Sequence, residues 1–306
     1  MALGALFCLS FPLYAGVVTD PLKGSQSSLT QANGGGLNLE ESALPFENPS
    51  SMASSQGRLF VQSSTLLGDV MQNVFAYTFP NADHQHQWGL ALVVLGIDDL
   101  IATQLDGSGH ISFDAGNSFF YDYRVGVLSY AFEFSEQWRL GSAVKYYTQT
   151  LEGYGSGSGW GCDLSVRFFM SPQTQLGLMW HNLLGGQMGW SNGAKDAMES
   201  YIQFAGNHRI LLLDQPLKLT AGLDLESQGI PAHLGACWTL AEVLSLRGGI
   251  DQTVSAKGGK TSYVTDLTFG VGLKARPFVL DYAFHPYAGF SDLSSHIFSV
   301  SYEFNH

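Results

Sequence analysis

The strongest constraint on this chain is a two-residue alternation of apolar and polar side chains that recurs along most of its length. It is clearest in residues 278–285, where every second residue is a large apolar one. Successive side chains of a β-strand point to opposite faces, so such a segment has one apolar and one mostly polar face. Aromatic residues near both ends of the apolar face are typical of a strand that faces lipid. A strand of a soluble β-sandwich would alternate in the same way, so the rest of the chain must decide between the two.

The alternation and the turn residues between its segments divide the chain into about fourteen strands, an even number, as expected of a single-chain bacterial barrel. The predicted strands are 58–65, 72–79, 86–96, 121–134, 137–151, 159–170, 173–183, 199–212, 216–226, 231–240, 243–253, 261–273, 276–286 and 295–304. Most have the length of about 9–11 residues that a tilted strand needs to cross a bilayer. We therefore predict an all-β fold, a transmembrane antiparallel β-barrel of about 14 strands over residues 57–306.

The connections between these strands favour a membrane barrel over a sandwich. Tight turns are predicted at 134–137, 171–173, 214–216, 240–242 and 275–277, with a slightly longer one at 81–85. Longer connections are predicted at 97–120, 152–158, 182–198, 255–260 and 286–294. Short periplasmic turns that alternate with longer outer loops are the pattern of an outer-membrane barrel. The last strand is expected to pair with the one that begins at Arg58.

Composition supports this interpretation and excludes others. Only 13% of the residues are charged, against about 25% in typical soluble domains. No apolar run reaches the roughly 20 residues that a membrane helix needs. The net charge of −12 argues against a nucleic-acid partner. The predicted location is the outer membrane of a Gram-negative-type bacterium.

The N-terminal part of the chain differs from the barrel. Residues 1–15 have the apolar core of a signal peptide, although the usual basic start is missing. Residues 16–56 are rich in Ser, Gly, Asn and Gln and lack strand alternation. We expect them to form a plug or hatch, with a disordered segment as the alternative.

The polar faces of the predicted strands carry charges of both signs, which indicates a lumen that holds water or a polar plug. The residues expected to form this lumen network are Lys145, Asp163, Arg167, Asp224, Arg247, Asp251 and Asp281, and Lys218 and Asp266 have the same orientation. Asp281 in particular needs a cationic neighbour. The network is interpreted as a set of structural salt bridges that hold the wall, with a substrate path as the alternative.

Several stretches resemble the PorV/PorQ group of outer-membrane proteins, which is itself similar to the FadL long-chain fatty-acid transporter family. They are residues 47–52 (ENPSSM), 143–168, 233–251, 280–283 (LDYA) and 296–304. Their order and spacing carry the resemblance, since each motif is weak by itself. Ser50 stands where the group has alanine, and the glycine- and arginine-rich stretch expected before Asn48 is not evident.

The resemblance implies two functions. The first is a FadL-like barrel that takes up hydrophobic or amphipathic small molecules across the outer membrane. The alternative is a PorV-like scaffold or shuttle for protein secretion, with a secreted protein as partner. Membrane lipid and the outer-membrane assembly machinery are further expected partners. Phe46, Glu47, Asn48 and Pro49 lie where the plug meets the barrel and are candidate ligand or plug-junction residues. Trp190, Tyr287 and Phe290 are candidate ligand contacts or interfacial anchors.

No catalytic residue, cofactor or metal is expected, and the chain is not interpreted as an enzyme. His84 and His86 have a spacing that suits one metal ion, but no third ligand lies nearby in sequence. No Gly-x-Ser-x-Gly elbow is present, and the glycine–serine run at 155–159 lacks the strand-to-helix context of one. Ser291, Asp292 and His296 flank a loop without visible oxyanion donors.

Overall fold

The computed structural model describes residues 17–18, 20–24, 26–52, 57–67, 70–79, 85–105, 111–153, 155–183, 186–257, 260–288 and 293–304 of the chain. The predicted signal peptide, residues 1–15, lies outside these ranges.

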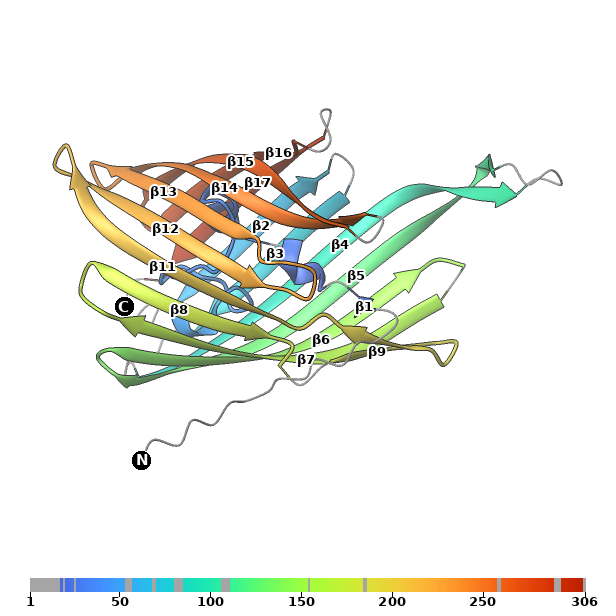
Figure 1. The fold of residues 1–306 in the computed structure, drawn as a ribbon, viewed down its shortest axis with the longest axis horizontal. Helices are drawn as coiled ribbons and strands as arrows, with labels where there is room; N and C mark the ends of the chain where they lie inside the picture. Colours follow the sequence, from blue (N-terminus) through green and yellow to red (C-terminus); the bar gives the residue numbers. More distant parts are fainter. Residues whose placement is uncertain are drawn as a thin grey trace.

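Fourteen antiparallel strands of this described chain close into a barrel (Figure 1). They are β2 (Arg58–Leu66), β3 (Val70–Thr78), β4 (His86–Leu105), β5 (Ile111–Ser135), β6 (Trp138–Leu151), β7 (Gly155–Phe169), β8 (Thr174–His181), β11 (Tyr201–Leu212), β12 (Gln215–Leu225), β13 (Ala232–Leu240), β14 (Leu244–Lys257), β15 (Lys260–Ala275), β16 (Phe278–Pro286) and β17 (Ser294–Glu303). Each strand pairs with its neighbour in sequence, β8 pairs with β11, and β17 closes the ring on β2. The predicted barrel and the pairing of its last strand with the one at Arg58 are confirmed.

The alternation places apolar side chains on the outer wall, as predicted. Leu280 of β16 and Phe298 of β17 are 42% and 59% exposed there. Asp281, the residue after Leu280 on β16, faces the lumen and is buried. Aromatic rings meet on the outer wall near the tight turns, for example Trp138 and Phe168 with centroids 4.4 Å apart. An apolar band bordered by aromatic rings is the surface that a bilayer requires of a barrel.

In the described part of the chain, no helix has the length and apolarity needed to span a membrane.

The tight turns lie where they were predicted, but the longer connections need corrections. Residues 152–158 and 255–260 were expected to be longer connections, but β7 begins at Gly155, β14 continues to Lys257 and β15 begins at Lys260. Residues 97–120 were expected to be a loop, but β4 continues to Leu105 and β5 begins at Ile111, so most of this region is a long hairpin projecting beyond the barrel (Figure 1). The pairing of β4 with β5 continues into this hairpin through two register shifts, one after Ile97 and one after Ile101. Within the expected loop at 182–198, β9 (Gln187–Trp190) and β10 (Lys195–Met198) pair with each other, and β9 also pairs with β7.

The N-terminal segment fills the lumen as a plug, which we define as the described residues from Asp20 to Met52. It contains a 3-10 turn η1 (Pro21–Gly24), a short helix α1 (Ser28–Ala32) and a second 3-10 turn η2 (Pro49–Ser51), and these coils lie inside the barrel in Figure 1. A short strand β1 (Val17–Val18) precedes the plug and pairs with β10. Helix α1 contacts β14 to β17, and η2 contacts β5 to β7. The plug therefore bridges opposite sides of the wall.

Two wall glycines let the plug backbone approach closely. Gly235 and Gly249 face each other across β13 and β14. A Cβ atom at Gly249 would lie 2.2 Å from the backbone nitrogen of Gly34, and one at Gly235 would lie 2.2 Å from the carbonyl oxygen of Asn33. Gly34 itself has φ of 84°, in the left-handed region that favours glycine. The glycine run at 34–36 and the wall glycines thus form one tight backbone contact.

Candidate functional site

The lumen wall has two chemically different sides. On one side, inward-facing apolar residues of β2 to β6 and the β9–β10 hairpin form a continuous cluster with the plug. Its members are Phe60, Val74, Ala76, Ala91, Val93, Tyr123, Val125, Val127, Ala143, Tyr147, Met188 and Met198 of the wall, and Leu22, Leu44 and Phe46 of the plug. Leu95, Tyr121 and Trp190 extend the cluster toward the end with the long connections. A wall of this kind suits apolar contacts, whereas a porin lumen is polar.

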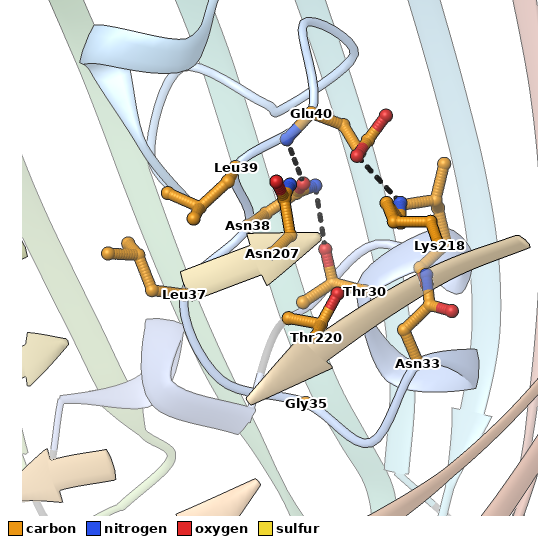
Figure 2. Close-up of a pocket in the computed structure, with 11 residues that line it drawn as sticks. Thr30, Asn33, Gly35, Leu37, Asn38, Leu39, Glu40, Asn207, Lys218 and Thr220 are labelled. Atoms are coloured by element: carbon orange, nitrogen blue, oxygen red, sulfur yellow. Dashed lines mark hydrogen bonds and ion pairs between the residues drawn. The ribbon is translucent and has the colours of Figure 1, made fainter. Parts of the chain in front are cut away.

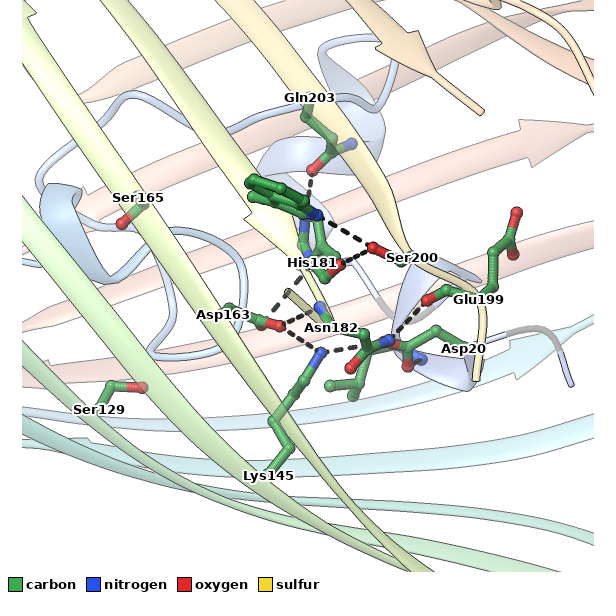
Figure 3. Close-up of polar contacts among 12 residues, drawn as sticks. Asp20, Ser129, Lys145, Asp163, Ser165, His181, Asn182, Glu199, Ser200 and Gln203 are labelled. Carbon is green, nitrogen blue, oxygen red and sulfur yellow. Dashed lines mark hydrogen bonds and ion pairs between the residues drawn. The ribbon is translucent and has the colours of Figure 1, made fainter. Parts of the chain in front are cut away.

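Beside the apolar cluster, where Lys145 lies between Ala143 and Tyr147 on β6, a buried ion cluster fastens the plug. The Lys145 ammonium lies 3.0 Å from the Asp20 carboxylate of the plug and 2.8 Å from the Asp163 carboxylate of β7, and all three side chains are fully buried. Figure 3 shows Lys145 reaching between the two acids, with Asn182 beside them. Two buried charges are tolerated only when they are paired and hydrogen-bonded, so this geometry ties the plug to the wall.

Asp20 has more partners than its ion pair. Its carboxylate accepts hydrogen bonds from the Tyr147 hydroxyl at 3.0 Å, the Asn182 amide at 3.0 Å and the Leu22 backbone N–H at 3.0 Å. Burial opposes the charged form, but the charge and hydrogen bond of Lys145 outweigh it and hold the Asp20 pKa below 3.8. Asp20 is therefore an anionic anchor at neutral pH.

From this cluster a chain of polar contacts follows the wall. The ring nitrogens of His181 lie 3.7 Å from Asp163 and 2.8 Å from the side-chain oxygen of Gln203. The Gln203 amide then donates to Asp224 at 3.0 Å. His233 lies between two acids, 3.2 Å from Asp224 and 3.0 Å from Asp251. We call this set of wall residues the polar belt: Lys145, Asp163, His181, Gln203, Asp224, His233 and Asp251.

The polar belt returns to the plug through helix α1. The Gln31 amide lies 3.2 Å from Asp251 and 2.8 Å from a ring nitrogen of His285, whose other nitrogen is 3.2 Å from Asp266. Asp20 and Gln31 are thus the two plug side chains that the belt holds.

The lumen residues expected from the sequence are buried except Arg247, which is half-buried, and they do not form one network. Lys145, Asp163, Asp224 and Asp251 belong to the polar belt. Arg247 and Asp281 form a separate pair at 2.6 Å, which supplies the cationic neighbour that Asp281 was expected to need. Arg167 lies apart, nearer the tight turns, where its guanidinium donates to Gln175 at 2.9 Å.

The expected junction residues are buried within the plug. Phe46 packs in the apolar cluster. Glu47 accepts hydrogen bonds from the backbone N–H groups of Ser27 at 2.6 Å and Leu44 at 3.1 Å. The Asn48 amide donates to the Asn38 carbonyl at 2.8 Å, and Pro49 begins η2. In this arrangement Glu47 and Asn48 bind other plug groups and fix its shape.

A small cavity of about 20 Å³ lies between the plug and β11–β12 (Figure 2). Its lining includes the Asn38 amide, which donates to the Thr30 hydroxyl at 2.9 Å, and Glu40, which lies 2.7 Å from the Lys218 ammonium. Its volume suits about one water molecule, too little for a substrate.

The other candidates contribute less. Trp190 packs at the edge of the apolar cluster and donates to Asp196 at 2.7 Å, and Tyr287 stacks on His285. Phe290, His84, Ser291 and Asp292 lie outside the described residues. Among the residues that are described, no three His, Cys, Asp or Glu side chains are grouped to hold a metal ion.

Sequence reasoning missed several belt residues. His181, Gln203 and His233 occupy inward positions of their strands, so the alternation contained the signal that would have placed them in the lumen. Asp20 and Gln31 lie in a segment without periodicity, and nothing in the sequence indicates their partners.

Comparison with solved structures identifies the fold. The chain is similar to the Ralstonia pickettii toluene transporter TbuX, with a TM-score of 0.59 and 14% identity over 91% of this chain and 98% of that one. It is similar to the Pseudomonas putida toluene transporter TodX, with a TM-score of 0.61 and 12% identity over 92% and 98%. A Pseudomonas aeruginosa FadL homologue gives a TM-score of 0.56 and 12% identity over 91% and 98%. No known family profile and no curated protein sequence matches the chain.

These neighbours confirm the FadL-like part of the expected resemblance at the level of the fold, which is that of outer-membrane barrels of Gram-negative bacteria. The PorV/PorQ assignment receives no support from a family match, and the secretion role expected as the alternative is not supported.

Proposed function

We propose that this barrel mediates the passage of hydrophobic or amphipathic small molecules across the outer membrane, without catalysing a reaction. The observation that carries the proposal is the apolar side of the lumen, formed by β2 to β6 and reaching from the plug toward the long connections. The fold shared with toluene transporters and a FadL homologue supports it.

The two sides of the lumen suggest how a ligand passes a plug. Apolar contacts are non-directional and scale with area at about 25 cal/mol per Å², so ligand contacts can replace those of Leu22, Leu44 and Phe46. The ion pair between Asp20 and Lys145 needs fixed geometry, and a hydrophobic ligand cannot replace it. The plug therefore yields along its apolar side and stays fastened along the polar belt.

Within this proposal, residues 1–15 are a signal peptide, 16–56 the plug and 57–306 the barrel. Phe46 is the plug side chain that a ligand displaces, and Glu47, Asn48 and Pro49 keep the junction folded. The lumen charges act as plug anchors. Membrane lipid surrounds the outer wall, and the outer-membrane assembly machinery inserts the barrel.

The test is uptake of a radiolabelled alkylbenzene by cells with an intact outer membrane that produce the protein. Val93 and Val125 face each other on β4 and β5, and both are fully buried in the lumen wall. The isosteric change of both to threonine places two hydroxyls in the path, at a cost of about 1–3 kcal/mol each. We expect uptake to fall about tenfold or more.

Val94→Thr is the matched control, because Val94 lies on the outer face of the same strand. It should leave uptake unchanged, and heat-dependent gel mobility should show a folded barrel for every variant. If cells with the folded wild-type protein take up no more alkylbenzene than cells without it, the proposal is wrong.

A further inference from the structure

Two polar groups on the inner face of the wall lack a hydrogen-bond partner at the apolar side of the lumen. Tyr123 of β5 is 2% exposed, and its hydroxyl group has no partner among the described residues. Gln149 of β6 is half-buried, and its side-chain oxygen is itself buried and also without a partner in the described chain. A buried polar atom without a hydrogen bond keeps its full desolvation cost, so each of these atoms is free to bind a ligand.

The two groups lie side by side on the proposed path. Tyr123 is paired with Gln149 across β5 and β6 and with Leu95 across β4 and β5. Paired residues of antiparallel strands point to the same face, with Cβ atoms about 4.5–5.5 Å apart. Tyr123 is also the next inward-facing residue after Val125 on β5, in the direction of the long connections. A ligand that enters along the apolar side therefore meets a hydroxyl donor and an acceptor oxygen together.

Aromatic rings surround this point. The Tyr123 ring meets the Tyr147 ring edge-on with centroids 6.3 Å apart, and lies 6.4 Å from the Tyr121 ring. Such distances suit edge-to-face and offset contacts, so an aromatic ligand can pack among these rings. The Tyr147 hydroxyl is already bound to Asp20 at 3.0 Å. Of the two tyrosines in the apolar cluster, Tyr123 is the one whose hydroxyl remains for a ligand.

A second pair of this kind lies away from the path. Ser64 of β2 and Gln72 of β3 are paired and buried, and the Ser64 hydroxyl and the Gln72 amide nitrogen have no partner among the described residues. The side-chain oxygen of Gln72 accepts from the Gln62 amide at 3.4 Å, and neither Ser64 nor Gln72 belongs to the apolar cluster. The pair at Tyr123 is therefore the one that a hydrophobic ligand reaches.

We propose that Tyr123 and Gln149 recognise the hydroxyl group of a phenolic ligand as it passes through the lumen. The ligand oxygen accepts a hydrogen bond from the Tyr123 hydroxyl, and the ligand O–H donates to the side-chain oxygen of Gln149. The ligand ring packs in the apolar cluster. The inference rests on the proposed function and narrows its substrate class to aromatic molecules that carry a neutral hydroxyl group.

The experiment compares p-pentylphenol with p-pentyltoluene, which differ by a hydroxyl in place of a methyl group. Binding of each radiolabelled compound to the purified full-length protein is measured by equilibrium dialysis, with the same detergent concentration on both sides. The Kd of p-pentyltoluene divided by that of p-pentylphenol measures recognition of the hydroxyl. We expect Tyr123→Phe to lower this ratio at least fivefold, through weaker binding of the phenol. The variant removes a hydroxyl without a partner, so it should fold.

Gln149→Met should also lower the ratio, and it keeps the test decisive if Tyr123→Phe does not fold. p-Pentylanisole separates the two contacts, because its oxygen accepts a hydrogen bond but has no proton to donate. Tyr123→Phe should weaken its binding, and Gln149→Met should not. Tyr146→Phe is the matched control, because Tyr146 lies on β6 with its side chain 40% exposed on the outer wall. It should leave the ratio unchanged.

A ratio that is the same in the wild-type protein and in both lumen variants would overturn the inference and leave the proposed function standing. An equal fall of the ratio in Tyr146→Phe would overturn it as well, since the effect would not come from the lumen. Binding of neither compound to the wild-type protein would count against the inference and the proposed function together.

Discussion

Lys145 is the residue on which the buried ion cluster depends, since it faces Asp20 and Asp163 within 3.0 Å on both sides. Its ammonium compensates two carboxylates that have no access to water. Lys145 and Asp20 are 125 positions apart in sequence, and their ion pair links the plug directly to the barrel wall.

Lys145→Met should therefore release the plug. Removing one partner of a buried ion pair leaves uncompensated charge and costs about 3–5 kcal/mol. We expect the free energy of local opening of the plug, measured by hydrogen exchange of the amides in 20–32, to fall by that amount. Lys274→Met is the control, because the ion pair of Lys274 is weak. The Lys274 side chain is 39% exposed, and its ammonium lies as far as 3.7 Å from the Glu303 carboxylate. This variant should change the opening free energy by about 0–1 kcal/mol, and an equal loss in both variants would contradict the assignment.

At the scale of elements, the plug has little structure of its own. Helix α1 has five residues, too few to be stable in water without tertiary contacts, although the Ser27 side chain caps its first turn. Its conformation is instead imposed by the wall, through the tight contact at Gly235 and Gly249 and through the polar belt. The plug should behave as one unit that docks or undocks.

The charged groups of the plug should keep their contribution to docking over a wide pH range. The pKa values of Asp20 and Glu40 are lowered from 3.8 and 4.5, so their contribution is present above these values and is lost as the pH falls through the lowered ones. Burial opposes the charge of Lys23, but Glu199 and Glu226 outweigh it and raise its pKa above 10.5. That contribution is complete below 10.5 and is lost as the pH rises through the raised value. The contribution of these three groups to plug protection, taken as the protection lost in Asp20→Asn, Glu40→Gln and Lys23→Met and corrected for intrinsic exchange rates, should stay constant from about pH 5 to pH 10. A loss that changes between pH 6 and pH 8 would contradict this.

At the scale of the whole molecule, the barrel is stabilised by closure and by lipid. The β17–β2 pairing runs from His296 opposite Thr65 to Glu303 opposite Arg58, so no edge strand of the barrel remains open. Val271, between Leu246 and Tyr282 on the neighbouring strands, lies in the apolar outer band.

Val271→Arg should destabilise the barrel in lipid vesicles by up to about 2–4 kcal/mol, the cost of a cation on the lipid face at the bilayer midplane, which decreases toward the interfaces. The measurement is urea unfolding followed by tryptophan fluorescence. Leu213→Arg serves as the control, because Leu213 lies in a tight turn and is 78% exposed. It should cost about 0–1 kcal/mol. If the two variants lose the same stability, the outer band does not face lipid at Val271.

Most of the barrel could be predicted because it depends on local pattern. A strand that faces lipid on one side and a lumen on the other must alternate, and the connections must contain turn residues. The β4–β5 hairpin beyond Ile97 escaped prediction because it projects past the bilayer, where no lipid face requires alternation. Its Asp98, Gly107 and Gly109 are typical of loops.

The sequence by itself determined the strands, their faces, the tight turns and the presence of a distinct N-terminal segment, because each follows from the order of neighbouring residues. Only the tertiary structure decided that Asp20 meets Lys145, that Gln31 meets Asp251, and that Arg167 lacks a carboxylate within the described chain. These contacts depend on how an aperiodic segment lies against a wall of fourteen strands. The path of this segment is fixed by close backbone contacts at wall glycines and by ion pairs between residues far apart in sequence. Neither kind of contact produces a local pattern in the sequence.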